Sequence, residues 1–343
     1  MSATRVVGFA CTLLAVASHA SGGAPSLMPP IVTTTVPSTD SQLDEPQPLY
    51  AAPTRLDRAG RIVASVEVNG RGPYRFVVDT GANRSAISPR LVTELALQPS
   101  AAGKVDLHGV TGSATLPSVD VASLRAGDLE IDPGAIPVLE SRVFADTDGI
   151  LGMEGFSDYR IDADFTADRV SIERSTGKRP RGNFYLVQAT NYRGLLLVDA
   201  QAGRIAVKAI IDTGAERTLG NAALRDALSA RADPRRRTQS RVIGATEDTY
   251  VGTSFVVPTL RIGSARLHNL HVTFGDMHVF RVWDLTEQPA VLIGMDMIGR
   301  LRRFAVDYRR SEVQLMPFRR AGTELRKCGP TECRSRIPEP DRI

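Results

Sequence analysis

Two stretches of the sequence share one string. "FVVDTGANRSAIS" runs from Phe76 to Ser88, and "AIIDTGAERTLG" runs from Ala209 to Gly220. A single Asp-Thr-Gly after an apolar run carries little information, because aspartate and glycine commonly close a strand with a turn. Two apolar runs that both end in DTGA require a joint explanation.

The two copies match beyond DTGA, which indicates an internal duplication. In each copy a hairpin leads into the motif, and a short helix, a glycine-containing turn, an apolar-apolar-Gly element and a final strand follow. The matched positions are Gly70 and Gly203, Asp79 and Asp212, Ser85 and Thr218, Leu91 and Leu224, Gly109 and Gly244, Gly152 and Gly294, and Asp164 and Asp307. The second copy is longer, and 275–288 is the expected insertion.

Each copy also predicts where its helix begins. Ser88 is the expected cap of the first helix, with Pro89 at the first helical position, where its missing N–H costs nothing. Asn221 is the expected cap of the second helix.

The composition permits two domains or one bilobal unit with a sizeable core, since the 343 residues are 42% hydrophobic. The formal net charge of +4 is too small to indicate a partner. The basic stretches 231–241 and 302–310 lack a stacking aromatic array, so we expect solvated faces and no nucleic-acid partner.

The two ends of the chain have their own signals. Residues 1–20 place Arg5 before an apolar run that ends in small residues, which predicts a cleaved signal peptide and a periplasmic or secreted protein. An uncleaved membrane anchor is the alternative. Residues 21–51 are expected to be a disordered linker or a propeptide, and 319–343 a polar tail. In an exported protein, Cys328 and Cys333 in that tail suit a local disulfide.

The histidines of "LHNLHVTFGDMHVF" are the nearest approach to a metal-binding cluster. We interpret this segment as a strand, on which His268, His271 and His278 alternate between faces because successive side chains point to opposite sides. No metal site is therefore predicted, and no cofactor is expected.

The paired motifs and the downstream ILG and LIG elements resemble the retropepsin-like and pepsin-like aspartic proteases over residues 60 to 317. The form DTGA and "IGMDMIGRLRRFAVDYRRSEVQL" are most similar to the bacterial retropepsin-like group. The resemblance implies an all-β, bilobal acid-protease fold. Its two homologous, β-barrel-like lobes, at 52–178 and 183–318, carry short helices and are related by a pseudo-twofold axis.

The same resemblance implies an aspartic endopeptidase with catalytic Asp79 and Asp212. Two carboxylates about 3 Å apart cannot both ionise, so they share one proton and divide the roles of acid and base. Water between them is then activated without a covalent intermediate. The expected supporting residues are Thr80 and Thr213, which grip the opposite loop, Gly81 and Gly214, which allow close approach, and the elements Ile150–Gly152 and Leu292–Gly294.

Two glycine turns match the position of the substrate-covering flaps of this family. The candidate flap residues are Gly109, Val110, Thr111 and Gly112 in the first copy, and Gly244, Ala245 and Thr246 in the second. Plain surface hairpins are the alternative interpretation. The first turn has no tyrosine, unlike pepsins, and Glu216 stands where the first copy has Asn83, so the two lobes are not equivalent.

Two other functions compete with this one. Actin-like phosphotransferases also carry two aspartate loops, but they need long helical patterns and a nucleotide loop that this sequence lacks. The second alternative is an exported binding protein with the protease fold and no activity. We expect a polypeptide substrate, no nucleotide, and a monomer, because one chain brings both aspartates.

Overall fold

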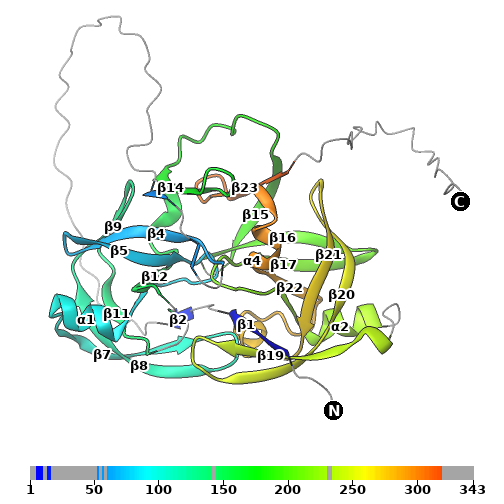
Figure 1. Cartoon of the computed structure of the whole chain (residues 1–343), viewed down its shortest axis with the longest axis horizontal. Helices are drawn as coiled ribbons and strands as arrows, with labels where there is room; N and C mark the ends of the chain where they lie inside the picture. The colour runs from blue at the N-terminus through cyan, green and yellow to red at the C-terminus, as the bar shows by residue number, and fades with distance from the viewer. Residues whose placement is uncertain are drawn as a thin grey trace, which may run out of the picture.

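The computed structural model describes residues 5–10, 14–16, 52–53, 56–57, 60–140, 144, 146–192, 194–229 and 234–318. Within these residues the fold is all-β and bilobal, as the sequence predicts (Figure 1). The expected linker 21–51 and the expected disulfide between Cys328 and Cys333 lie outside the described residues. No helix in the described part is long and apolar enough to cross a bilayer.

Lobe one contains two sheets. The strands of the first are β4 Val63–Val68, β5 Arg71–Val78, β6 Ala86–Ile87, β9 Leu124–Ala126, β10 Leu129–Ile131 and β12 Gly149–Leu151. They are ordered β10-β9-β4-β5-β12-β6. The strands of the second are β2 Leu14–Val16, β7 Pro99–His108, β8 Ser113–Val121 and β11 Gly134–Pro137. They are ordered β11-β8-β7-β2, so that β7 and β8 form the long hairpin at the bottom of Figure 1.

Lobe two repeats this arrangement and closes more completely. Its strands are β16 Leu195–Ala202, β17 Ile205–Ile211, β18 Leu219–Gly220, β19 Thr238–Gly244, β20 Thr249–Ile262, β21 Ala265–Phe274 and β22 Ala290–Ile293, with β1 Arg5–Ala10 on the edge of β19. Because β20 pairs with β16 as well as with β21, the strands curl into a barrel. The hairpin β19–β20 corresponds to β7–β8.

A six-stranded section of sheet, continuous with that of lobe two through the pairing of β15 with β16, joins the lobes and is called the joining sheet. Its strands are β3 Ala52–Pro53, β13 Tyr159–Asp164, β14 Arg169–Arg174, β15 Tyr185–Tyr192, β23 Leu301–Asp307 and β24 Glu312–Pro317, in the order β15-β24-β23-β13-β14-β3. The closing strand of each lobe, β13 or β23, pairs antiparallel with that of the other. Two hydrogen bonds of 2.5 and 3.0 Å from the Arg303 guanidinium to Asp162 tie the two strands together. In Figure 1 this sheet lies at the edge opposite the two long hairpins.

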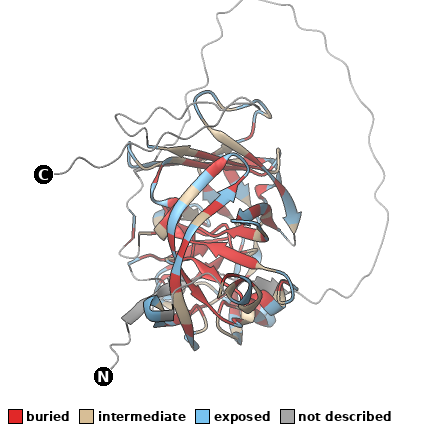
Figure 2. Cartoon of the chain, turned by 90° about the vertical axis from the view of Figure 1, so that its right-hand side faces the viewer, coloured by how far each residue is buried: buried red, intermediate tan, exposed pale blue. Residues whose placement is uncertain are grey.

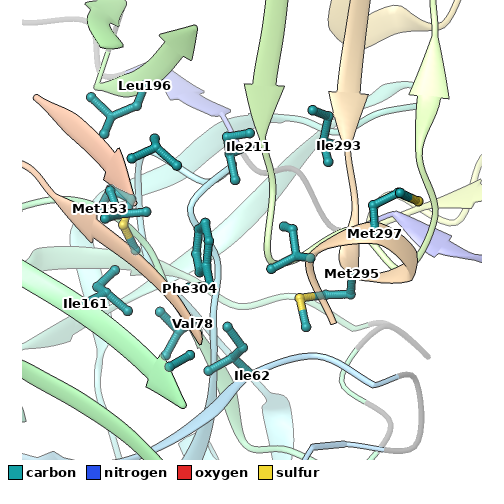
Figure 3. Packing of buried hydrophobic residues seen from close by; sticks show 14 of the residues in the cluster. Ile62, Val78, Met153, Ile161, Leu196, Ile211, Ile293, Met295, Met297 and Phe304 are labelled. Atoms are coloured by element: carbon teal, nitrogen blue, oxygen red, sulfur yellow. The ribbon is translucent and has the colours of Figure 1, made fainter. Parts of the chain in front are cut away.

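The largest apolar core crosses the boundary between the lobes. Phe304 of the joining sheet is fully buried and packs among side chains of both lobes (Figure 3). Figure 3 labels its neighbours in this cluster as Ile62, Val78, Met153, Ile161, Leu196, Ile211, Ile293, Met295 and Met297. The buried residues form a continuous band through the middle of the molecule (Figure 2). The two lobes therefore share one core.

The helices are short and follow the apolar strands. They are α1 Pro89–Leu95, α2 Ala222–Ser229, α3 His278–Val282 and α4 Met295–Ile298, with 3-10 turns at Phe156–Asp158 and Pro234–Arg236. The predicted caps are confirmed, since the Ser88 hydroxyl accepts from the N–H of Leu91 at 3.3 Å and Asn221 accepts from Leu224 at 2.8 Å.

The expectation that 267–280 is a continuous strand is wrong at its end. His268 and His271 lie on β21, but His278 is the first residue of α3. Gly275 and Asp276 break the strand there. Among the described residues no group of three or more His, Cys, Asp or Glu side chains could hold a metal ion.

Candidate active site

Each aspartate follows directly on a buried strand that the repeat positions in the same way. Strand β5 runs parallel to β12, and β17 runs parallel to β22, so each DTGA strand lies beside its own ILG or LIG strand. The N–H of Asp79 donates to the carbonyl of Leu151, and that of Asp212 to the carbonyl of Ile293, both at 3.0 Å. These bonds fix where each strand ends and its loop begins.

The two aspartate loops meet between the lobes. A Cβ atom added to Gly81 would lie 2.5 Å from Cγ of Asp212, and one added to Gly214 would overlap the carboxyl group of Asp79. Such short distances leave no room for any side chain larger than a hydrogen atom. Glycine at both positions is therefore what allows the two carboxyl groups to approach each other.

The carboxyl groups are fully buried and hydrogen-bonded to their own loops. Oδ1 of Asp79 accepts from the N–H of Gly81 at 2.9 Å, and Oδ1 of Asp212 accepts from Gly214 at 2.9 Å and Ala215 at 3.0 Å. Both aspartates are 0% exposed. No N–H or O–H group of the described residues donates to Oδ2 of Asp79, which leaves this oxygen with the Asp212 carboxyl as its neighbour.

This environment favours one shared proton. Burial first, and then the negative charge of Asp212 and a hydrogen bond with it, hold the pKa of Asp79 well above the usual range for a carboxyl group. The N–H of Gly81 and the charge of Arg61 oppose that rise only partly. Because the two groups titrate as a pair, the pair carries one negative charge over a wide pH range.

The two threonines of the motifs cross between the loops. The Thr80 hydroxyl donates to the carbonyl of Ile211 at 2.7 Å and accepts from the N–H of Thr213 at 3.1 Å. Reciprocally, the Thr213 hydroxyl donates to the carbonyl of Val78 at 2.5 Å and accepts from the N–H of Thr80 at 3.0 Å. Each threonine thus holds the residue that precedes the opposite aspartate.

A second pair of carboxyl groups holds each loop from outside, and the sequence analysis missed it. The Thr218 hydroxyl donates to Asp296 at 2.7 Å and accepts from the N–H of Gly294 at 3.2 Å. In lobe one the corresponding set is Glu154, which accepts from the N–H of Ser85 at 2.6 Å, and Ser85, whose hydroxyl accepts from Gly152 at 3.0 Å.

Both of these outer carboxyl groups are shielded from solvent, and burial raises the pKa of Glu154 and of Asp296. The signal was present in the sequence, because Gly-Met-acidic follows the apolar strand in both copies.

Arg61 is another residue that pattern reasoning did not find. It is 1% exposed and donates to Asp57 through its backbone N–H at 2.8 Å and its Nε at 2.7 Å. Its charge lowers the pKa of Asp79 against the larger effect of burial. The Tyr308 ring is buried near the same aspartate, and burial and the Asp79 charge both raise the pKa of its hydroxyl.

The candidate flap turns lie against the aspartate loops, each on the opposite lobe. Val110 of the first turn is buried in an apolar cluster of lobe two that includes Ala215 of the second DTGA. Ala245 of the second turn is buried in a cluster of lobe one that includes Ala82 of the first DTGA. The turns also touch each other, since the Thr111 hydroxyl donates to the carbonyl of Asp248 at 2.8 Å.

The lobes differ at the position after each DTGA. Arg84 donates to the carbonyls of Pro133 and Ala135 at 3.0 and 2.9 Å, which ties the first loop to β11. The corresponding Arg217 is half exposed and lies 3.9 Å from Glu216. The two lobes are thus not equivalent at Asn83 and Glu216, as expected, and they also differ in the contacts of the next residue, Arg84 or Arg217.

A family model described as aspartyl protease matches the chain twice, at residues 64–154 and 198–297. The chain belongs to the aspartyl protease family. Each match contains one DTGA motif and its apolar-apolar-Gly element, so the family pattern occurs once per lobe. Membership of this family overturns the actin-like alternative.

The solved structures that resemble the chain include an aspartic proteinase from Irpex lacteus. It is 14% identical in sequence, and the similarity covers 78% of this chain and 97% of that one, with a TM-score of 0.47. No curated protein matches the chain.

Proposed function

We propose that the chain is an endopeptidase that hydrolyses peptide bonds of extended polypeptides with water activated between Asp79 and Asp212. The observation that carries this proposal is the pair of buried carboxyl groups, one of which has an oxygen that no described N–H or O–H group satisfies. A protease-fold binding protein has no need to maintain such a costly pair.

The proposed reaction uses the pair first as base and acid, then in reverse. The ionised carboxylate takes a proton from water as its oxygen attacks the carbonyl carbon, and the shared proton moves to the carbonyl oxygen. The resulting diol collapses as one of its hydroxyl groups returns a proton to the second carboxylate, the first carboxyl group protonates the amide nitrogen, and the C–N bond breaks. The proton count of the pair is restored, and no covalent enzyme intermediate forms.

The chain's own first strands support an extended substrate. Strand β1 pairs parallel with β19, and β2 pairs antiparallel with β7. Strands β19 and β7 are equivalent and related by a pseudo-twofold axis, so they run in opposite directions. One chain that crosses this axis in a straight line is therefore parallel to β19 and antiparallel to β7. The pairing ends at Ala10 opposite Gly244 and resumes at Leu14 opposite His108, next to the two turns. Free edges of β7 and β19 would accept a peptide in the same way.

The proposal predicts that either aspartate is indispensable. Asp79→Asn and Asp212→Asn should each lose nearly all cleavage of an unfolded protein substrate, because neither group can act alone as both acid and base. Asp199→Asn is the matched control, since that carboxyl group is exposed and pairs only with Lys208 among the contacts of the structure. Near-parental cleavage by either catalytic variant would refute the shared mechanism, and binding without cleavage by the parent would favour the binding-protein alternative.

The same variants test the proposed monomer. Because one chain brings both aspartates, a mixture of the Asp79→Asn and Asp212→Asn chains should stay as inactive as either chain alone. Substantial recovery of activity on mixing would show that the working site forms between two chains.

We also propose that the protein is exported after removal of residues 1–20, on the basis of Arg5 and the apolar run alone. N-terminal sequencing of protein from its native host should find a chain that begins near residue 21. A chain that still begins at Met1 would contradict export by this route.

A further inference from the structure

The two turns over the aspartate loops are held by different contacts. In the turn at 244–248, Ala245 is buried in the lobe-one cluster and Gly244 lies opposite Ala10 of β1. The turn at 109–112 is supported by helix α3, which belongs to the insertion of lobe two. The N–H of Val279 in this helix donates to the carbonyl of Val110 at 3.2 Å. The first turn therefore docks on a helix of the other lobe.

A histidine pair spans this docking contact. Nδ1 of His108, the last residue of β7, lies 3.2 Å from Nε2 of His278, the first residue of α3. Their ring centroids are 5.4 Å apart, and both side chains are half-buried. One neutral imidazole can donate to the other at this distance, but two protonated rings have no acceptor between them and repel.

The other charged groups near the pair do not neutralise a second proton. Arg281, one turn along α3, adds a further positive charge that faces His278. Asp248, from the opposite turn, is the nearby anion, and its carboxylate already accepts from the Thr246 hydroxyl at 2.9 Å. On β7, Asp106 shares a face with His108 and accepts from the Thr115 hydroxyl at 2.7 Å.

We propose that His108 and His278 form an acid-sensitive latch that closes the 109–112 turn of lobe one onto helix α3 of lobe two. Above about pH 6.5 the neutral pair is bonded and the turn is closed. Below that pH protonation of both rings breaks the pair and the turn is released. The catalytic carboxyl groups are 0% exposed in the closed form, and the turn packs against the loop that carries Asp212. Under the proposed function, release of the turn would help a polypeptide to enter or leave.

The sign of the effect follows from the surroundings of His278. Burial first, then the charges of His108 and Arg281, lower the pKa of His278 in the closed form below its ordinary value of 6.5. A depressed histidine pKa means that the closed form is favoured above pH 6.5 and loses that advantage as the pH falls toward the lowered value. Over that window the opening constant rises by up to about tenfold per pH unit for each linked proton.

Hydrogen exchange of the full chain tests the latch without any need for turnover. The amide of Val279 is protected only while α3 holds Val110, so peptides that contain Val279 report opening. After correction for the intrinsic rate, exchange there should accelerate by about tenfold or more between pH 7.5 and pH 5. Amides of β5 should keep their protection, which separates opening of the turn from unfolding.

Glutamine at either histidine keeps a hydrogen-bonding amide and removes the titration. In His278→Gln and in the double variant the acid step should disappear, and in His108→Gln it should shrink, because burial still lowers the pKa of His278 there. His268→Gln is the matched control, because His268 lies on β21 with the Thr259 hydroxyl as its partner at 3.1 Å, and its acid step should persist. Exchange in the parent that does not change with pH, or an acid step that survives in the double variant, would overturn the latch.

Discussion

Replacing Thr80 by valine tests the contact that joins the two aspartate loops. Valine fills the same volume, so no cavity forms, but it removes the hydroxyl that donates to the Ile211 carbonyl and accepts from the Thr213 N–H. Both backbone groups stay buried, since Ile211 is 4% exposed and Thr213 is 0% exposed. Each buried group left without a partner costs about 1–3 kcal/mol, which gives a loss of about 2–6 kcal/mol for the variant.

Thr80→Ser is the matched control. It keeps both hydrogen bonds and loses one methyl group, which costs about 1 kcal/mol. The single tryptophan of the chain, Trp283, is fully buried in lobe two, so its fluorescence in a urea titration reports the unfolding of the lobe opposite to the substitution. We expect the valine variant to unfold at clearly lower urea than the serine variant. Equal midpoints for the two variants would show that the crossed hydroxyl bonds do not stabilise the assembled lobes.

Two further predictions concern the aspartate pair. Asp79→Asn should raise the melting temperature at pH 7, because the raised pKa of Asp79 means that its ionisation destabilises the fold. The advantage should shrink as the pH falls from the raised pKa toward the pKa of an unfolded aspartate, below which it is absent. A difference in melting temperature that is constant with pH would contradict this. Gly81→Ala should abolish cleavage and lower the melting temperature, because its Cβ would lie 2.5 Å from Cγ of Asp212. Gly109→Ala is the control and should fold with little change, since its Cβ would lie 3.5 Å from the nearest atom of Thr246. Equal melting temperatures of the two variants would refute the steric argument.

Local sequence signals predicted the elements next to the aspartates. An apolar run followed by DTGA defines where β5 and β17 end, and Ser88, Pro89 and Asn221 define where α1 and α2 begin. These features depend on neighbours within a few residues, which is why a single sequence reveals them. Because the pattern occurs twice, the sequence also predicted that two similar lobes pair with each other.

Contacts between distant segments were not predictable in this way. The burial of Val110 in lobe two and of Ala245 in lobe one depends on how two turns cross in space, and neither residue type signals it. The contact between His108 and His278 joins residues 170 positions apart, and the strand expected at 267–280 includes the residues that form the helix carrying His278. Glu154 and Asp296 could have been found, because both follow Gly-Met in the repeat.

Helix α3, which receives Val110, belongs to lobe two, so the two halves differ where they meet. A symmetric pair of lobe-one halves would present two turns with Val110 at the tip and no copy of α3. A pair of lobe-two halves would offer two receiving helices and two turns with Ala245 at the tip instead of Val110. After the duplication each half has thus diverged to fit the other. A dimer of two identical halves would lack one partner of each contact between turn and opposite lobe, so both halves would have to change together to restore such a dimer.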